Sequence, residues 1–146
     1  MVSAIVFDLG GVLIDLDFDS CVRSFREVLG YERITELLER LAEKYAIYGL
    51  TNNNEISVER MHKIYEENGL DWQRVFRKEF ISCRMQLMKP SREIFDAAAA
   101  EIGFPPEEIL FVDDSQKNVD GALAAGWQAA LYVQGTDLGA CLANYL

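Results

Sequence analysis

Apolar residues along the chain alternate between short continuous runs and longer amphipathic stretches. Short runs predict buried strands, because a strand covered on both faces shows no alternation of apolar and polar residues. The strands predicted in this way span residues 3–7, 46–50, 109–112 and 128–133. Helical spacing of apolar residues predicts helices over residues 20–29, 34–41, 57–67, 71–80, 90–102 and 119–125, with a short helix near the C-terminus. Residues 81–87 fit a short strand and loop.

This alternation predicts an α/β fold, a Rossmann-like three-layer α/β/α sandwich with a mainly parallel sheet covered on both faces. The 146 residues suit one domain over the whole chain, residues 1–146. In such sheets, ligands bind outside the carboxyl ends of the strands. Polar groups follow three predicted strands, namely Asp8, Thr51, and the pair Asp113 and Asp114. We therefore expect these side chains to converge on one site.

Composition and charge narrow the range of partners. The net charge of −10 argues against binding to duplex nucleic acid, which requires basic surface. It does not argue against a phosphorylated substrate, because an acidic cluster can bind Mg²⁺ and the metal then supplies positive charge. No apolar run reaches the length that a bilayer requires, and no basic leader precedes the first strand, so we expect neither a membrane span nor a signal peptide. Three widely spaced cysteines favour reduced thiols and a cytoplasmic location.

Two strand ends carry groups that suit phosphate chemistry. Asp8 enters a glycine turn, where backbone groups can approach a ligand closely. Thr51 and Asn52 place a hydroxyl and free backbone N–H groups after the next strand, a pattern that can hold phosphate. The alternative interpretations are structural. Asp8 can simply end a strand, and Thr51 or Asn52 can cap the following helix.

Two further features complete the candidate site. Lys89 places an ammonium before a predicted helix, although a lone lysine there is usually solvated. Asp113 and Asp114 place adjacent carboxylates after a buried strand. Because neighbouring carboxylates repel each other, a partner cation is expected, and oxygen donors suit Mg²⁺. An exposed turn at these two aspartates is the alternative.

The order of these features resembles the four motifs of the haloacid dehalogenase superfamily. The segments that carry the resemblance are Phe-Asp-Leu-Gly-Gly-Val at residues 7–12, Leu-Thr-Asn at 50–52, Lys-Pro-Ser-Arg-Glu-Ile-Phe at 89–95 and Phe-Val-Asp-Asp at 111–114. The likeness extends from residue 2 to about residue 133 and is similar in detail to the sugar-phosphate phosphatase branch. It implies a Mg²⁺-dependent phosphomonoester hydrolase that acts on small phosphorylated metabolites such as sugar phosphates.

The resemblance also implies roles for individual residues. Asp8 would attack phosphorus and form an aspartyl-phosphate, and Lys89 would neutralise charge between nucleophile and phosphate. Thr51 and the N–H of Asn52 would hold phosphoryl oxygens. Asn118 would orient Lys89 or Asp114. The implied Mg²⁺ ligands are the carboxylates of Asp8 and Asp114, the backbone carbonyl of Gly10, and Asp113 either directly or through water.

The sequence departs from the family pattern at Gly10. Most phosphatases of the superfamily have an aspartate two residues after the nucleophile, where it protonates the leaving group. Gly10 has no side chain, and Asp15 is the nearest candidate replacement. This departure keeps two alternatives open, a weakly active scaffold that binds Mg²⁺ and phosphate, or a hydrolytic dehalogenase, which needs no acid at that position.

The second departure is the absence of the usual helical cap. Residues 30–34 lead directly into residues 37–45, which resemble the helix before the second strand. Without a cap, we expect an open site with low substrate selectivity. The apolar stripe formed by Trp72, Val75, Phe76 and Phe80 is either core or a surface that a cap would cover. If exposed, such a surface is a candidate homodimer interface.

Overall fold

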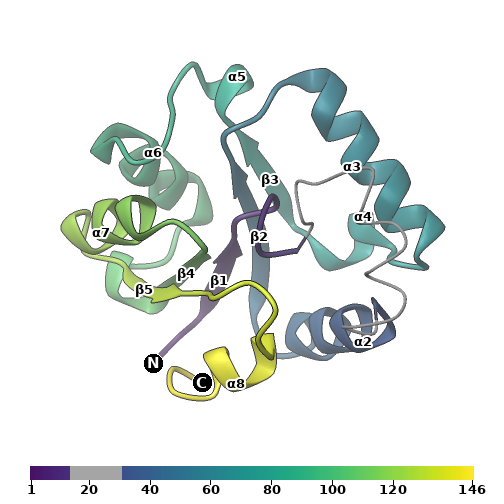
Figure 1. The fold of residues 1–146 in the computed structure, drawn as a ribbon. Coiled ribbons are helices and arrows are strands. Elements are labelled where there is room, and N and C mark those ends of the chain that lie inside the picture. Colours follow the sequence, from purple (N-terminus) through teal and green to yellow (C-terminus); the bar gives the residue numbers. More distant parts are fainter. Residues whose placement is uncertain (14–30) are drawn as a thin grey trace.

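The computed structural model describes residues 1–13 and 31–146, which form a five-stranded parallel sheet between helices (Figure 1). The strand order is β3-β2-β1-β4-β5. The strands are β1 (Ala4–Phe7), β2 (Ala46–Thr51), β3 (Lys78–Ile81), β4 (Ile109–Asp113) and β5 (Gln128–Leu131). Every residue of β1, β2 and β4 is buried, as expected for central strands with both faces covered.

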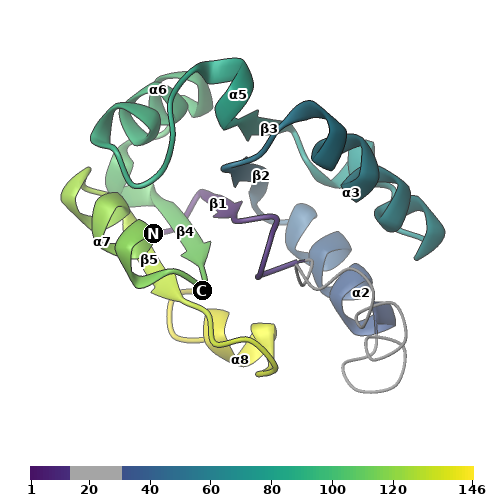
Figure 2. The same ribbon diagram turned by 45° about the horizontal axis from the view of Figure 1, so that its top comes forward.

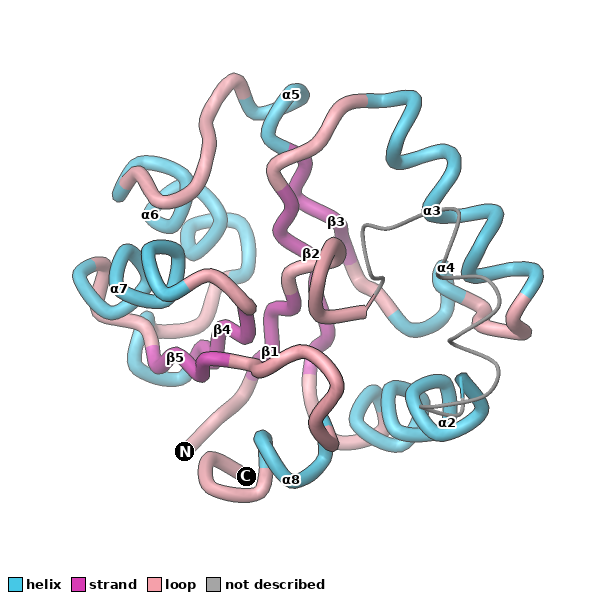
Figure 3. The backbone as a smooth tube through the Cα atoms, viewed as in Figure 1, coloured by secondary structure: helices cyan, strands magenta, loops and turns pink. Residues whose placement is uncertain are grey.

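Helices cover both faces of this sheet and surround the strands (Figures 2 and 3). Their bounds are α2 (Tyr31–Ala42), α3 (Glu55–Glu67), α4 (Trp72–Val75), α5 (Ser82–Met85), α6 (Arg92–Ile102), a 3₁₀ turn (Pro106–Glu108), α7 (Gln116–Ala124) and α8 (Leu138–Leu142). Among the described residues, no helix is both long and apolar enough to cross a bilayer. The sheet with helices on both faces confirms the three-layer α/β/α architecture predicted from the sequence.

Side chains of β1 alternate between two hydrophobic cores, one on each face of the sheet. Ile5 and Phe7 pack with residues of α2, α3 and α8, whereas Ala4 and Val6 pack with residues of α6 and α7. This alternation follows from the two-residue period of a strand. The two cores fix β1 at the centre of the molecule, and β1 leads directly into Asp8.

The predicted helix over residues 71–80 is wrong. Only α4 is helical there, and Lys78–Ile81 form the edge strand β3, which pairs with β2. Phe76 and Phe80 stand four residues apart, which mimics helical spacing, but they belong to different cores. Val75, Phe76 and Phe80 are all buried, so the apolar stripe belongs to the interior and is not the exposed surface considered for a homodimer.

Several predicted boundaries also need correction. Residues 82–85 form helix α5 in place of the expected strand and loop. Helix α6 begins after Ser91, so Pro90 precedes the helix, while α7 begins three residues before the predicted start. β5 ends at Leu131, two residues early. The predicted helix over residues 20–29 lies outside the described residues.

Candidate active site

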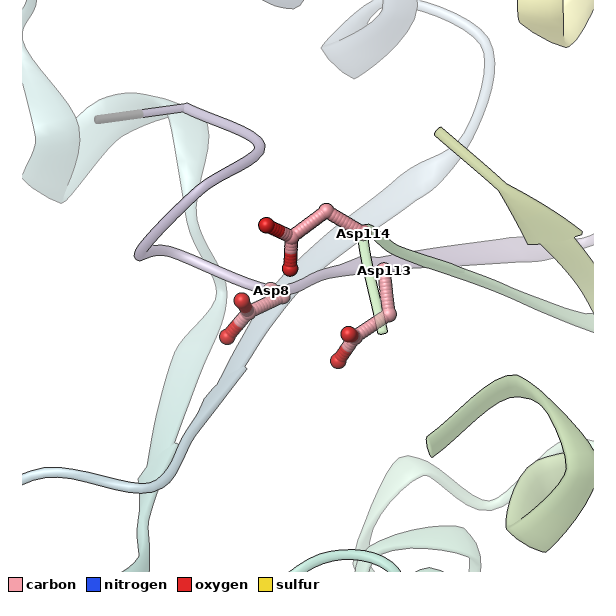
Figure 4. Close-up of side chains that lie close together, drawn as sticks. All are labelled: Asp8, Asp113 and Asp114. Carbon is pink, nitrogen blue, oxygen red and sulfur yellow. The ribbon is translucent and has the colours of Figure 1, made fainter. Parts of the chain in front are cut away.

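Three carboxylates meet where β1 and β4 end. The parallel register pairs Phe7 with Val112, so Asp8 and Asp113 follow at the same level of the sheet. The backbone N–H of Asp8 donates to the Val112 carbonyl at 2.8 Å. Asp8, Asp113 and Asp114 each place a carboxylate oxygen within 4.8 Å of the other two (Figure 4). The convergence expected from the strand ends is therefore present for these three aspartates.

Lys89 lies between two of these carboxylates. Its Nζ is 2.8 Å from Asp8 Oδ1 and 2.7 Å from Asp113 Oδ2, and only 1% of its side chain is exposed. This geometry excludes the interpretation of Lys89 as a solvated surface charge. A buried ammonium requires such partners, because an unpaired buried charge is strongly destabilising.

The site carries more negative than positive charge, because three carboxylates surround one ammonium. Burial raises the pKa of Asp8 to about 7, against the opposing effect of Lys89, and nearby Asp113 and Asp114 add to the rise. Burial and the charge of Asp113 also raise the pKa of Asp114. A divalent cation among these oxygens would offset the surplus charge. The oxygen donor set and its partial burial fit Mg²⁺.

Hydrogen bonds fix the orientation of the Asp113 carboxylate. Besides Lys89, it accepts from the backbone N–H of Ser115 at 2.8 Å and from Asn118 Nδ2 at 3.0 and 3.1 Å. The prediction that Asn118 orients Lys89 or Asp114 is corrected, since its amide bonds with Asp113. Ser115 and Asn118 both lie at the start of α7, directly after β4.

Asp114 has a partner that the sequence did not reveal. Gln134 Nε2 donates to Asp114 Oδ2 at 2.9 Å from the segment after β5. No motif marks this glutamine, and only the parallel pairing of β5 with β4 brings it to the site. A prediction of the strand order would have been needed to find it.

Position 11 requires glycine because it lies directly against Asp114. Its φ of +83° lies in the left-handed region, and a Cβ there would lie 2.3 Å from Asp114 Oδ2. Gly10 lies in the same turn, two residues after Asp8. Its carbonyl remains a predicted metal ligand, and Asp15, the candidate acid, lies outside the described residues.

The predicted phosphate loop follows β2. Thr51 is the last residue of that strand and is buried, and Asn52 follows it. The alternative of a helix cap is wrong for both residues, because Asn54 caps α3 by accepting from the Ser57 N–H. The Asn52 side chain bonds with the backbone of Lys89. Phosphate binding by Thr51 and the Asn52 N–H stays a prediction.

His62, the single histidine of the chain, takes part in packing. Its Nε2 lies 2.5 Å from Glu79 Oε2, and its ring stacks on Trp72 with centroids 3.7 Å apart. These contacts join α3, α4 and β3. These contacts give His62 a structural role.

The family of haloacid dehalogenase-like hydrolases matches residues 19–126. No curated protein matches the sequence.

Solved structures share the fold. One is a variant of a haloacid dehalogenase (HAD) family enzyme from Bacteroides thetaiotaomicron, in complex with magnesium and inorganic phosphate, with a TM-score of 0.75 and 24% identity over 96% of this chain and 98% of that chain. Another is a predicted HAD-like hydrolase from Porphyromonas gingivalis, with a TM-score of 0.78 and 23% identity over 96% of each chain. A larger HAD hydrolase from Bacillus subtilis, bound to magnesium, has a TM-score of 0.60 and 22% identity, over 68% of this chain and 42% of that one.

Proposed function

Because the chain belongs to the haloacid dehalogenase-like hydrolase family, we propose that it is a Mg²⁺-dependent phosphomonoesterase that acts on small phosphorylated metabolites such as sugar phosphates. The observation that carries this proposal is the meeting of three carboxylates with one buried ammonium at the ends of β1 and β4. Magnesium and phosphate in the structurally similar Bacteroides enzyme support the same assignment.

Asp8 is the nucleophile in this proposal. One of its carboxylate oxygens bonds to phosphorus while the phosphorus–oxygen bond to the leaving group breaks, which forms an aspartyl-phosphate. Water then attacks phosphorus, phosphate departs, and the Asp8 carboxylate is restored. Lys89 offsets the repulsion between the carboxylate and the incoming phosphate, because its ammonium already lies 2.8 Å from Asp8 Oδ1.

The remaining residues bind and orient. The Thr51 hydroxyl and the Asn52 N–H hold phosphoryl oxygens at the end of β2. The carboxylates of Asp8, Asp113 and Asp114, with the Gly10 carbonyl, hold Mg²⁺. When bound there, Mg²⁺ supplies the positive charge that lets two anions approach each other. The hydrogen bonds from Ser115, Asn118 and Gln134 keep two of these carboxylates in place.

The absent acid at Gly10 favours a second candidate function, a scaffold that binds Mg²⁺ and phosphate with little turnover. Well-placed acid–base groups contribute ~10²–10⁴ in rate. Without one, cleavage depends on how readily the leaving group departs unprotonated. Hydrolytic dehalogenation is disfavoured, because displacing halide needs no metal. In that reaction the Asp114 carboxylate beside Asp8 would have no role.

A phosphatase screen with and without Mg²⁺, beside Asp8→Asn, tests the proposal. We expect Mg²⁺-dependent release of phosphate by the wild type and none above background by Asp8→Asn. Haloacids are included as substrates. Halide release without Mg²⁺ would replace the proposal with dehalogenation, and phosphate binding without turnover would favour the scaffold.

A further inference from the structure

We propose that the side chain of Asn52 is a positioning residue that sets Lys89 against Asp8. The inference rests on the proposed function and goes beyond it, because there only the backbone N–H of Asn52 takes part. The Asn52 amide instead bonds twice with the backbone of Lys89. Nδ2 donates to the Lys89 carbonyl at 2.9 Å, and Oδ1 accepts from the Lys89 N–H at 2.8 Å.

These two bonds join the loop after β2 to the segment after α5, beyond the end of the β2–β3 pairing. Thr51 and Ile81 form the last pair of the β2–β3 register. Beyond it the chain leaves β3 through α5 and returns at Lys89, in the segment between α5 and α6. The Asn52 amide supplies one donor and one acceptor to a backbone that has no strand beside it. Asn52 is exposed but Lys89 is buried, so removing the Asn52 amide takes hydrogen-bond partners from the backbone of a buried residue, which costs free energy.

The segment at Lys89 also contacts helix α7. Helix α7 approaches so closely that a Cβ at Gly121 would lie 2.6 Å from the Pro90 carbonyl oxygen. The backbone of residues 89–90 therefore contacts both Asn52 and helix α7. Fixing this backbone matters because a lysine side chain is flexible, and the Lys89 ammonium has to bridge Asp8 and Asp113.

A separate contact ties the loop after β2 to the start of helix α5 without Asn52. The Ser82 hydroxyl accepts from the Asn53 N–H at 2.9 Å and donates to the Asn53 carbonyl at 3.2 Å. We therefore expect removal of the Asn52 side chain to release the Lys89 backbone while the loop after β2 stays tied to α5. The effect should be local to the ammonium.

The substitutions follow from the bonding pattern. Asn52→Ala removes both hydrogen bonds. Asn52→Asp keeps an acceptor for the Lys89 N–H but turns an oxygen toward the Lys89 carbonyl, so it should act in the same direction while preserving shape. Asn53→Ala is the matched control, because that side chain contacts the Asn54 N–H and the Met61 sulfur and not Lys89.

The first measurement is the ¹⁵N-correlated NMR signal of the Lys89 ammonium in metal-free protein, assigned with Lys89→Ala. A buried ammonium between two carboxylates exchanges its protons slowly enough to be seen. We expect the signal in the wild type and in Asn53→Ala, and expect it broadened or lost in Asn52→Ala and Asn52→Asp. An unchanged signal in both Asn52 variants would overturn the inference, even if the protein proves to have no phosphatase activity.

The second measurement is a double-mutant cycle for Mg²⁺-dependent hydrolysis of p-nitrophenyl phosphate. Misplacement of Lys89 should lower kcat/KM by ~10–100-fold in Asn52→Ala, and Asn53→Ala should match the wild type. In a Lys89→Ala background, Asn52→Ala should cause no further loss. If the losses in kcat/KM caused by Asn52→Ala and Lys89→Ala multiply in the double variant, Asn52 acts on the substrate directly. That result would overturn the inference. A Lys89→Ala variant with full activity would instead contradict the proposed function.

Discussion

At the scale of single residues, the site depends on how a few buried charges offset one another. Asp113 accepts hydrogen bonds from Lys89, Ser115 and Asn118. Asp8 has the same ammonium as its partner and is almost completely buried. Lys89 is therefore shared, and the pKa of Asp8 rises to about 7 despite this partner.

Metal-free protein should lose stability as Asp8 ionises. Its pKa rises from an ordinary 3.8 to about 7 on folding, so between these values the folded state holds a proton that the unfolded state has lost. The free energy of unfolding therefore falls as pH rises through this window, and the contribution of protonated Asp8 is gone above about pH 7. We expect the Tm of Asp8→Asn, relative to wild type, to increase from about pH 5 to about pH 8.

The control for this pH profile is Asp120→Asn, which removes an exposed carboxylate from α7. Its Tm difference from the wild type should stay constant over the same range. A constant difference for Asp8→Asn as well would contradict the raised pKa of Asp8. Adding Mg²⁺ should reduce the loss of stability, because ionised Asp8 is then a metal ligand.

Gly10→Asp tests what the missing acid costs. A carboxylate at this position can protonate a departing alkoxide, whereas a nitrophenolate leaves without such help. The gain should therefore be concentrated on alkyl phosphates and reach ~10²-fold when the geometry is right. Rates on both substrate classes check this, with thermal unfolding in parallel. A folded variant without gain on alkyl phosphates would show that protonation is not limiting.

The key residues of the site were predictable one by one, but their contacts were not. Asp8, Asp113 and Asp114 follow buried strands, and the parallel strand ends bring them together. Gln134 and the Asn52 side chain carry no comparable signal, because each contact joins segments whose approach depends on strand order. Sequence spacing cannot give that order.

At the scale of elements, the central strands could be predicted from the sequence, whereas the edge strand β3 could not. Apolar runs in β1, β2 and β4 match their complete burial. β3 pairs with β2 at the edge of the sheet and contains Lys78 and Glu79 among apolar residues, so its pattern resembles an amphipathic helix. Partial burial therefore caused the wrong prediction for residues 71–80.

The turn after β1 gives a prediction at this scale. Gly11→Ala should lower stability, since a left-handed conformation costs roughly 1–2 kcal/mol for an L-residue and the new Cβ meets the Asp114 carboxylate. Displacement of Asp114 should also weaken Mg²⁺ binding. Gly103→Ala is the matched control, because its φ is +79° and nothing lies within 4 Å of its added Cβ. Gly103→Ala should lose stability but keep its affinity for Mg²⁺.

Thermal unfolding and Mg²⁺ titration distinguish the two glycine variants. Only Gly11→Ala should lose affinity for Mg²⁺. Equal Mg²⁺ affinity in both variants would show that the turn does not shape the metal site, and would remove the reason given for glycine at this position.

At the scale of the whole molecule, metal binding should stabilise the fold. A ligand that binds only the native state raises the free energy of unfolding by an amount that grows with its concentration. The Tm of the wild type should therefore rise with Mg²⁺. Asp114→Ala should abolish this rise, whereas Asp120→Ala should keep it. Equal stabilisation of the wild type and Asp114→Ala would exclude Asp114 as a ligand.

The central claim is that Asp8 accepts a phosphoryl group in a Mg²⁺-dependent site. Fluoroberyllate mimics a phosphoryl group on a carboxylate, and its ¹⁹F NMR spectrum distinguishes bound from free species. We predict a bound signal for the wild type with Mg²⁺, and none without Mg²⁺ or in Asp8→Asn. A bound signal of equal strength in Asp8→Asn, or none in the folded wild type with Mg²⁺, would contradict the assignment of Asp8 as the nucleophile.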